Sequence, residues 1–352
     1  MPIMAESAAD LLQATARSFY LTLRVLPRRV RAPIGLAYLL ARTTDTIADT
    51  ELVPPDQRLA ALHQLRDGIL GGSHAPLVFA ELARQQGSPA ERLLLERAGD
   101  GLAALQRCPA GDRKLIQDVL ITITSGQELD LQRFAGRPDQ RAATGPSDVI
   151  ALATLAELDD YTYRVAGCVG EFWTKLCRAH LFPNVALDEA RFVADGVRFG
   201  KGLQLVNILR DLPADWANGR CYLPWEALTP AGLTPENLLR PENEAAFLRL
   251  FRAHLDQAES HLAAGWRYTN TLPFRQFRVR LACGWPLLLG VKTIGKMRRT
   301  GLAGLQRRVK VSRGEVYRLI CASTLACPVP LFWRMLWRKL DAKAVASGCN
   351  LA

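Results

Sequence analysis

Apolar residues recur along most of the chain at the three- and four-residue spacing of an amphipathic helix. Strictly alternating apolar and polar runs, the pattern of a half-buried strand, are scarce. The sequence therefore predicts an all-α fold. The segments with clear helical spacing are Pro33–Ala48, Ser88–Leu105, Lys114–Phe134, Asp148–Leu158, Arg191–Leu209 and Glu244–Ala264.

Residues that interrupt helices separate these segments. Gly, Pro, Asn and Asp gather at four breaks, none of them long enough to be a linker between domains: Gly71–Pro76, Ala135–Asp148, Phe182–Asn184 and Asn218–Pro224. A length of 352 residues is compatible with two domains. The short breaks favour a single large helical domain over residues 1–352, with a core at about 15–320 and a basic, amphipathic C-terminal segment at 321–352.

Two of the predicted helices carry acidic residues at regular intervals. In the run YLLARTTDTIAD, steps of four, three and four place four side chains on one helix face: Tyr38, Arg42, Asp45 and Asp49. In the run QLVNILRDLPAD, steps of three, four and four do the same for four more: Gln204, Asn207, Asp211 and Asp215. We call these sets the first stripe and the second stripe.

The spacing of the carboxylates indicates what the stripes could bind. The side chains near them are mostly neutral or apolar, so a divalent cation is the simplest counter-charge. Magnesium binds one or two carboxylates together with water and phosphate oxygens, so two facing stripes would hold several magnesium ions around a diphosphate. Alternatively, Asp45 and Asp49 pair with Arg42 or lie on a solvated helix face. One stripe alone favours that alternative, whereas two stripes in apolar helices favour the metal.

Four strings in the sequence resemble conserved blocks of the squalene/phytoene synthase family, the head-to-head prenyl transferases. The strings are RSF at 17–19, YLLARTTDTIAD at 38–49, YTYRVAGCVGEFW at 161–173 and GLQLVNILRDLPADWANGRCYLP at 202–224. The resemblance extends from about Ser18 to Leu319. It implies the isoprenoid synthase fold with a central cavity, and a reaction that joins two prenyl diphosphates through a cyclopropylcarbinyl diphosphate.

The resemblance also implies a role for each matching position. The metal ligands for Mg²⁺ would be Asp45, Asp49, Asp211 and Asp215. The substrate diphosphates would be held by Arg17, Ser18, Gln204, Asn207 and Arg210. The catalytic positions would be Tyr161, Phe19, Arg42 and Tyr38. Phe19 would face the carbocation, Tyr161 would handle a proton near the leaving diphosphate, and Arg42 would hold diphosphate oxygens.

The residues themselves leave some of these roles open. Without the resemblance, ordinary core packing is the better interpretation of Phe19 and Tyr161. Gly167 and Gly170 fit either a close approach of two helices or room for a prenyl chain. In the second stripe Ala214 stands where the family usually has Glu, and Pro213 should bend the helix.

The product depends on how the last carbocation is quenched. Squalene requires a hydride from NADPH, phytoene or dehydrosqualene requires proton loss, and some members stop at presqualene diphosphate. The segment Gly301–Leu319 resembles the loop of squalene synthases that closes over NADPH, so Lys310 and Arg313 would bind this cofactor. We predict a squalene synthase that uses two farnesyl diphosphates, Mg²⁺ and NADPH. A phytoene, dehydrosqualene or presqualene diphosphate synthase is the alternative.

Positive charge gathers in the C-terminal third of the chain. The net charge is +11, and Ser260–Leu340 contains sixteen basic residues and one acid, Glu315. This excess fits a solvated face or attraction to anionic lipid. Nucleic-acid binding is a weaker rival, because the sequence contains no helix-turn-helix, zinc finger or basic–aromatic repeat. With no CxxC pair and no secretory signal, we expect a cytoplasmic enzyme whose contact with a membrane, if any, is peripheral and through this surface.

Overall fold

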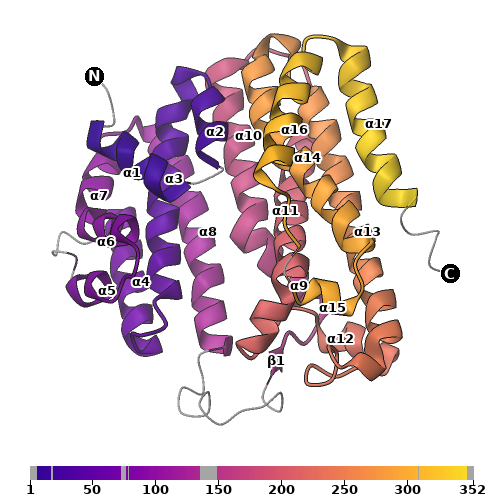
Figure 1. The fold of residues 1–352 in the computed structure, drawn as a ribbon. Coiled ribbons are helices and arrows are strands. Elements are labelled where there is room, and N and C mark those ends of the chain that lie inside the picture. The colour runs from indigo at the N-terminus through magenta and orange to yellow at the C-terminus, as the bar shows by residue number, and fades with distance from the viewer. Residues whose placement is uncertain are drawn as a thin grey trace. The chain divides into compact units, whose positions relative to one another are not determined.

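The computed structural model describes residues 6–16, 19–72, 77, 79–134, 149–307 and 309–346. Almost all of the secondary structure in these ranges is helical (Figure 1). The exceptions are two short strands that pair in parallel, β1 (Ile150–Ala151) and β2 (Arg220–Cys221). The predicted all-α fold class is confirmed. Among the described helices, none combines the length and the apolar character that crossing a membrane requires.

The chain forms two compact units, each built from two separate stretches of sequence. Unit 1 consists of residues 1–136 and 171–185, and unit 2 consists of residues 137–170 and 186–352. Helix α10 (Cys168–Leu181) contributes to both. The organisation as a single domain stays a prediction.

Unit 1 is organised around the long helix that carries the first stripe. Its helices are α1 (Glu6–Ala16), α2 (Phe19–Val25), α3 (Arg28–Asp49), α4 (Pro55–Leu70), α5 (Ala80–Arg84), α6 (Pro89–Glu96), α7 (Ala98–Gln106) and α8 (Ala110–Phe134). Helix α3 packs against α4, α7 and α8. The predicted helix Ser88–Leu105 is two helices, because Arg97 leaves the helical backbone geometry between α6 and α7.

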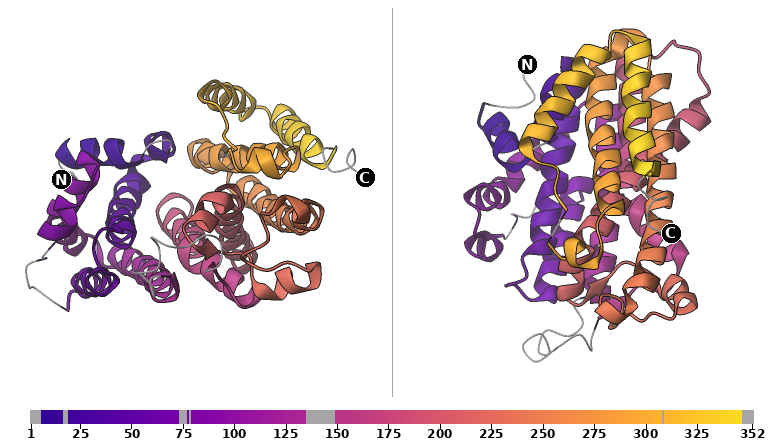
Figure 2. Two further views of the ribbon diagram at one scale, coloured as in Figure 1. Left: turned by 60° about the horizontal axis from the view of Figure 1, so that its bottom comes forward. Right: turned by 45° about the vertical axis from the view of Figure 1, so that its right-hand side comes forward.

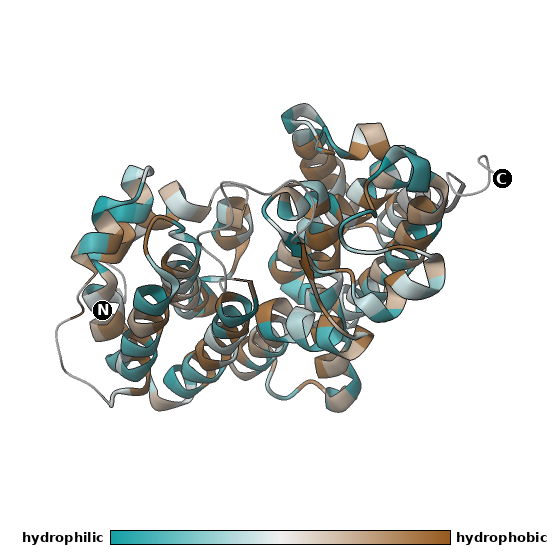
Figure 3. Ribbon diagram, turned by 90° about the horizontal axis from the view of Figure 1, so that it is seen from below, coloured by the Kyte–Doolittle hydropathy of each residue, from teal (hydrophilic) through white to brown (hydrophobic). Residues whose placement is uncertain are grey.

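Unit 2 is layered around the helix that carries the second stripe. Its helices are α9 (Leu155–Thr162), the π-helix η2 (Tyr163–Gly167), α11 (Glu189–Ala217), α12 (Trp225–Leu228), η3 (Thr229–Ala231), η4 (Pro241–Asn243), α13 (Glu244–Thr271), η5 (Phe274–Gln276), α14 (Phe277–Arg298), α15 (Leu302–Leu305), α16 (Arg313–Ala326) and α17 (Pro330–Ala346). Helix α11 packs on α13 and α14, and α14 packs on α16 and α17 (Figure 2). In Figure 3, single helices carry hydrophobic residues on one side and hydrophilic residues on the other, as amphipathic spacing requires.

The predicted helix Asp148–Leu158 is wrong in its first half. Asp148 lies outside the described residues, and the helix begins only at Leu155, where the Thr154 side chain accepts a hydrogen bond from the backbone N–H of Glu157. Before it, the backbone N–H of Ile150 donates to the carbonyl oxygen of Gly219 at 2.9 Å. The strand thus depends on a partner about seventy residues away, which a local spacing pattern cannot show.

Glycine brings the backbones of unit 2 into direct contact. A Cβ atom on Gly170 would lie 2.0 Å from the carbonyl oxygen of Gly196, and one on Gly200 would lie 2.1 Å from that of Ala166. Such distances leave no room for a side chain, so η2 and the start of α10 touch α11. For Gly170 the structure therefore favours the close approach of two helices.

This contact predicts a large loss of stability for Gly170→Ala. The added methyl group would force α10 away from α11 and should cost more than about 2 kcal/mol of unfolding free energy. Gly314→Ala is the matched control, because a Cβ there meets no atom within 4 Å. Chemical denaturation of both variants tests this, and equal midpoints would show that the helices are not in contact at Gly170.

Candidate active site

The first stripe lies along the accessible face of α3. Tyr38, Arg42 and Asp45 are partly exposed and Asp49 is exposed. Six of the residues between them are buried, namely Leu39, Leu40, Thr43, Thr44, Thr46 and Ile47. The four side chains therefore share one face, as the spacing predicts.

The contacts of Asp45 show how its negative charge is balanced. Gln127 of α8 donates a hydrogen bond from Nε2 to Oδ1 of Asp45. Arg42 is farther away, with 3.8 Å between its Nη1 and the other carboxylate oxygen. The shorter contact of Arg42 is with Glu91 of α6, where Nη2 donates to Oε1 at 2.5 Å. Arg42 is thus shared between two acids and balances Asp45 only in part.

The pKa of Asp45 reflects this incomplete balance of its charge. Burial, and then the nearby charge of Asp49, raise the pKa of Asp45 from 3.8 to about 7, while Arg42 and Gln127 act in the opposite direction. The side chain nevertheless keeps 45% of its surface exposed. A cation that reached the carboxylate would relieve the repulsion between Asp45 and Asp49.

Aromatic rings lie next to the first stripe. The ring of Phe19, the first residue of α2, stacks on the ring of Tyr38 with 5.0 Å between centroids. The Tyr38 hydroxyl donates a hydrogen bond to the carbonyl oxygen of Thr15 at 3.2 Å. Both rings are only partly buried. Arg17 and Ser18 lie outside the described residues, so their predicted roles stay predictions.

The second stripe lies along the accessible face of α11. Gln204, Asp211 and Asp215 are partly exposed and Asn207 is exposed. Five of the residues between them are buried, namely Leu205, Val206, Ile208, Leu209 and Leu212, whereas Ala214 is exposed. The helix continues through Pro213 to Ala217.

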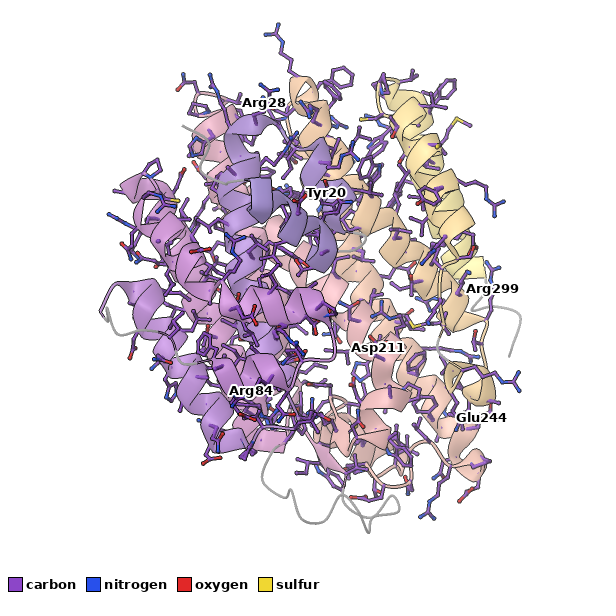
Figure 4. The ribbon with its side chains drawn as sticks, turned by 60° about the vertical axis from the view of Figure 1, so that its left-hand side comes forward. Tyr20, Arg28, Arg84, Asp211, Glu244 and Arg299 are labelled. Atoms are coloured by element: carbon purple, nitrogen blue, oxygen red, sulfur yellow. The ribbon has the colours of Figure 1, made fainter. Side chains whose placement is uncertain are left out.

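Asp211 has a cation beside it in the sequence. Figure 4 marks Asp211 on α11, and the Arg210 guanidinium donates to both of its carboxylate oxygens, with Nε 3.1 Å from Oδ1 and Nη2 2.5 Å from Oδ2. Asp215 lies one turn further along, near β2. Burial, with a smaller contribution from the charge of Asp215, raises the pKa of the Cys221 thiol to about 12. The two acids of this stripe therefore differ in their surroundings.

Tyr161 lies in the last turn of α9, two residues before the π-helix η2 begins. Its ring stacks on the ring of Tyr222 with 4.7 Å between centroids, and it remains partly exposed. Segments of π-helix occur often at functional sites. Next to it, Lys201 of α11 donates to both carboxylate oxygens of Asp159 at 2.7 Å, which ties α9 to α11.

The predicted cofactor residues flank the start of α16. Ser312 caps this helix, and its hydroxyl and the Glu315 carboxylate bond each other's backbone N–H groups. Glu315 also pairs with Lys296 at 2.7 Å and Lys292 at 3.2 Å, and its pKa is lowered mainly by Lys296 and then by the Ser312 backbone. Lys310 and Arg313 are exposed, and their side chains make no hydrogen bond or ion pair with the described residues.

Two residues outside the predicted site position the first stripe, Gln127 and Glu91. For Gln127 a signal was present: steps of four, three and four put it on the same face of α8 as three buried residues, Ile116, Leu120 and Ile123. A polar side chain on a buried face requires a polar partner. The sequence contains no comparable signal for Glu91. It lies in the first turn of a short helix, where acidic residues are common.

The donor set of the stripes fits magnesium bound together with phosphate. Within the described ranges, no three His, Cys, Asp or Glu side chains gather in one group that could hold a metal ion. Each stripe offers two carboxylates four residues apart. Mg²⁺ is commonly held by one or two carboxylates, water and substrate phosphate oxygens rather than by a cage of protein ligands.

Comparisons with known proteins agree with the fold and with the predicted family. The model of the family described as squalene/phytoene synthase matches residues 12–315. A presqualene diphosphate synthase of Rhodopseudomonas palustris is 29% identical over 270 residues, 77% of this chain and 80% of the relative. A phytoene synthase of Pseudescherichia vulneris is 32% identical over 167 residues, 46% of this chain and 49% of the relative.

Solved structures extend the likeness to the whole fold. A structure described as TcSQS in complex with the ligand E5700 superposes with a TM-score of 0.73 at 20% identity, over 97% of both chains. At this identity the likeness concerns the fold, which is the isoprenoid synthase fold predicted from the sequence. The central cavity of that fold stays a prediction for this chain.

The raised pKa of Asp45 predicts a dependence of stability on pH and magnesium. Because the folded protein holds the Asp45 proton more tightly than the unfolded chain, ionisation of Asp45 destabilises the fold progressively between about pH 4 and pH 7. In metal-free buffer, Asp45→Asn should therefore melt higher than wild type at about pH 8, and this advantage should disappear at about pH 4. Mg²⁺ should raise the wild-type melting temperature more at the higher pH, because protons compete with the metal, and should raise that of Asp45→Asn less than that of wild type. Asp67→Asn, an exposed acid on α4, is the control. If Mg²⁺ raised the melting temperatures of wild type and Asp45→Asn equally, Asp45 would not be a ligand of the metal.

Proposed function

Since the chain belongs to the squalene/phytoene synthase family, we propose that it condenses two farnesyl diphosphates with Mg²⁺ to presqualene diphosphate. Members of this family are head-to-head prenyltransferases, so the chain is an enzyme of this class. The observation that carries the proposal is the pair of carboxylate stripes, each on the accessible face of a helix whose opposite face is buried. The relative with presqualene diphosphate synthase activity supports the choice of product.

In this proposal the stripes and two arginines bind the diphosphates. Asp45, Asp49, Asp211 and Asp215 are the proposed ligands of Mg²⁺, which neutralises the diphosphate as it departs. A cation bound to Asp211 would weaken the ion pair between Asp211 and Arg210. The Arg210 guanidinium can then donate to a diphosphate oxygen. Arg42 can do the same on the first stripe, because Glu91 fixes only one of its nitrogen atoms.

The chemistry breaks one C–O bond and forms a cyclopropane ring. The electron pair of that bond leaves with the diphosphate, the double bond of the second substrate attacks the allylic cation, and ring closure releases one proton. The stacked rings of Phe19 and Tyr38 offer a π face near the first stripe, which is the kind of surface that stabilises a cation. Tyr161 is the proposed residue that handles a proton near the diphosphate, and its stacking on Tyr222 orients the phenol.

Reduction of the intermediate to squalene with NADPH is a second candidate. The specific observation in its favour is that Lys310 and Arg313 are exposed at the start of α16, on either side of the capping residue Ser312. Glu315, the nearest acid, is engaged by Lys292 and Lys296 and does not compete for them. Two such cations three residues apart could bind the phosphates of the cofactor as charge-assisted donors.

Product analysis separates these candidates. With farnesyl diphosphate and Mg²⁺, we expect presqualene diphosphate by mass spectrometry, in equal amount with and without NADPH. If squalene formed, and only in the presence of NADPH, the enzyme would be a squalene synthase rather than a presqualene diphosphate synthase. In that case Lys310→Ala/Arg313→Ala should raise the KM for NADPH at least about tenfold, whereas Arg307→Ala/Arg318→Ala should not. Phytoene from geranylgeranyl diphosphate, with no product from farnesyl diphosphate, would contradict both candidates.

A further inference from the structure

A groove of about 590 Å³ lies within unit 2, on α13, α14 and α17. None of its lining residues belongs to either stripe. Four arginines line it, Arg267, Arg280, Arg334 and Arg338, and no acidic residue does. The groove is therefore a concentration of positive charge separate from the proposed active site.

Arg280 is the buried cation of this groove. It is only 9% exposed, and no carboxylate contacts it among the described residues. Its Nη2 donates to Oδ1 of Asn270 at 3.0 Å, and its Nε is buried without a hydrogen-bond partner in the described part of the chain. A buried guanidinium with neutral partners alone is costly, because its charge has lost water and gained no counter-charge. An anion in the groove would supply that counter-charge.

The other three arginines leave most of the positive charge available. Arg267 is paired with Asp195, with 2.8 Å between Nη2 and Oδ1. Arg334 and Arg338 form no ion pair with any side chain that the structure describes. An anion entering the groove would therefore meet several donors and no like charge.

The remaining wall of the groove is aromatic. The Trp266 ring stacks on Trp333 and on Trp337, with 5.2 and 4.7 Å between centroids. Trp333 donates from Nε1 to the same Asn270 oxygen that holds Arg280. The Arg280 guanidinium lies over the Phe274 ring at 5.7 Å from its centroid. Trp333 and Trp337 are buried, at 1% and 9% exposed, so the stacked rings form a rigid wall beside the arginines.

Exposed apolar side chains continue from the groove. The turn between α13 and α14 and the turn between α16 and α17 lie at the same end of unit 2 (Figure 1). Large apolar residues at these two turns are 40–78% exposed, namely Phe274, Phe277, Leu325, Val329, Leu331, Phe332 and Met335. Their concentration at one end marks an interaction surface rather than scattered surface residues. We call this set the apolar end.

We propose that the apolar end docks on a membrane and that the arginine groove binds the phosphate of an anionic phospholipid. The charge of the groove selects the anionic headgroup, and the exposed side chains of the apolar end enter the acyl boundary. The proposed contact is peripheral, through the apolar end and the groove. The inference stands independently of the proposed condensation, since its test needs no substrate.

Sedimentation with lipid vesicles tests the proposal. The protein should bind vesicles of phosphatidylcholine mixed with phosphatidylglycerol and not vesicles of phosphatidylcholine alone. Arg334→Gln/Arg338→Gln should weaken binding about thirtyfold, which corresponds to about 1 kcal/mol for each basic residue at the surface. Both side chains lie on the outer helix α17, and thermal unfolding checks that the variant folds normally.

The matched control removes the same charge from the opposite end of unit 2. Arg249 lies near the start of α13, and Arg307 lies just after α15. These two places are close together, because the backbone N–H of Leu302, the first residue of α15, donates a hydrogen bond to Glu244, the first residue of α13. Arg249→Gln/Arg307→Gln should bind mixed vesicles like wild type. If both double variants bound vesicles equally weakly, net charge alone would explain the loss. That result would contradict the proposal that the groove binds the lipid phosphate.

A second variant tests the apolar end. Leu331 and Phe332 are 64% and 55% exposed, so Leu331→Gln/Phe332→Gln should fold normally. We expect it to lose at least tenfold in affinity for mixed vesicles. Unchanged binding of this variant, equal binding of wild type to phosphatidylcholine alone, or no binding to either vesicle would each overturn the proposal.

Discussion

Two carboxylates held four residues apart on a packed helix repel each other, and the candidate active site depends on how this repulsion is relieved. On α3 the relief is incomplete: the pKa of Asp45 is raised to about 7, and Arg42 makes its shorter contact with Glu91. On α11 the neighbouring residue Arg210 binds Asp211 with two hydrogen bonds. A cation at the first stripe would therefore displace mainly a proton, whereas a cation at the second would displace an arginine. That arginine then becomes available to the diphosphate, so metal and substrate binding would support each other.

The two stripes could be predicted because they depend on spacing within one helix. The leucine, isoleucine and valine residues between the stripe positions are buried on both α3 and α11, as the predicted shared faces require. The contacts of the stripes could not be predicted in the same way, because Gln127 is eighty-two residues from Asp45 in sequence. The ion pair of Arg210 with Asp211 is a different case, since adjacent residues of a helix do not face each other and only the length of the arginine side chain allows the contact.

The predicted helices differ from the observed ones at two places. Helical spacing placed a helix over Asp148–Leu158, but Ile150 and Ala151 pair with the segment that follows α11. The break at Arg97 left the spacing of apolar residues intact on both sides, so one helix was predicted where two exist. Pro213 has the opposite effect: the ring removes one backbone hydrogen bond, yet α11 continues to Ala217. For β1, a contact far away in the sequence decided the outcome.

The central claim is that the stripe carboxylates hold the magnesium that carries away the diphosphate. Single-turnover release of diphosphate from farnesyl diphosphate tests it most directly, in wild type, Asp45→Asn and Asp211→Asn, with Asp67→Asn as the control. Removal of one charged group that stabilises a leaving group costs on the order of 100-fold in rate, so both stripe variants should fall by at least that factor while the control releases diphosphate at the wild-type rate. Release by either stripe variant at the rate of the control would contradict the account.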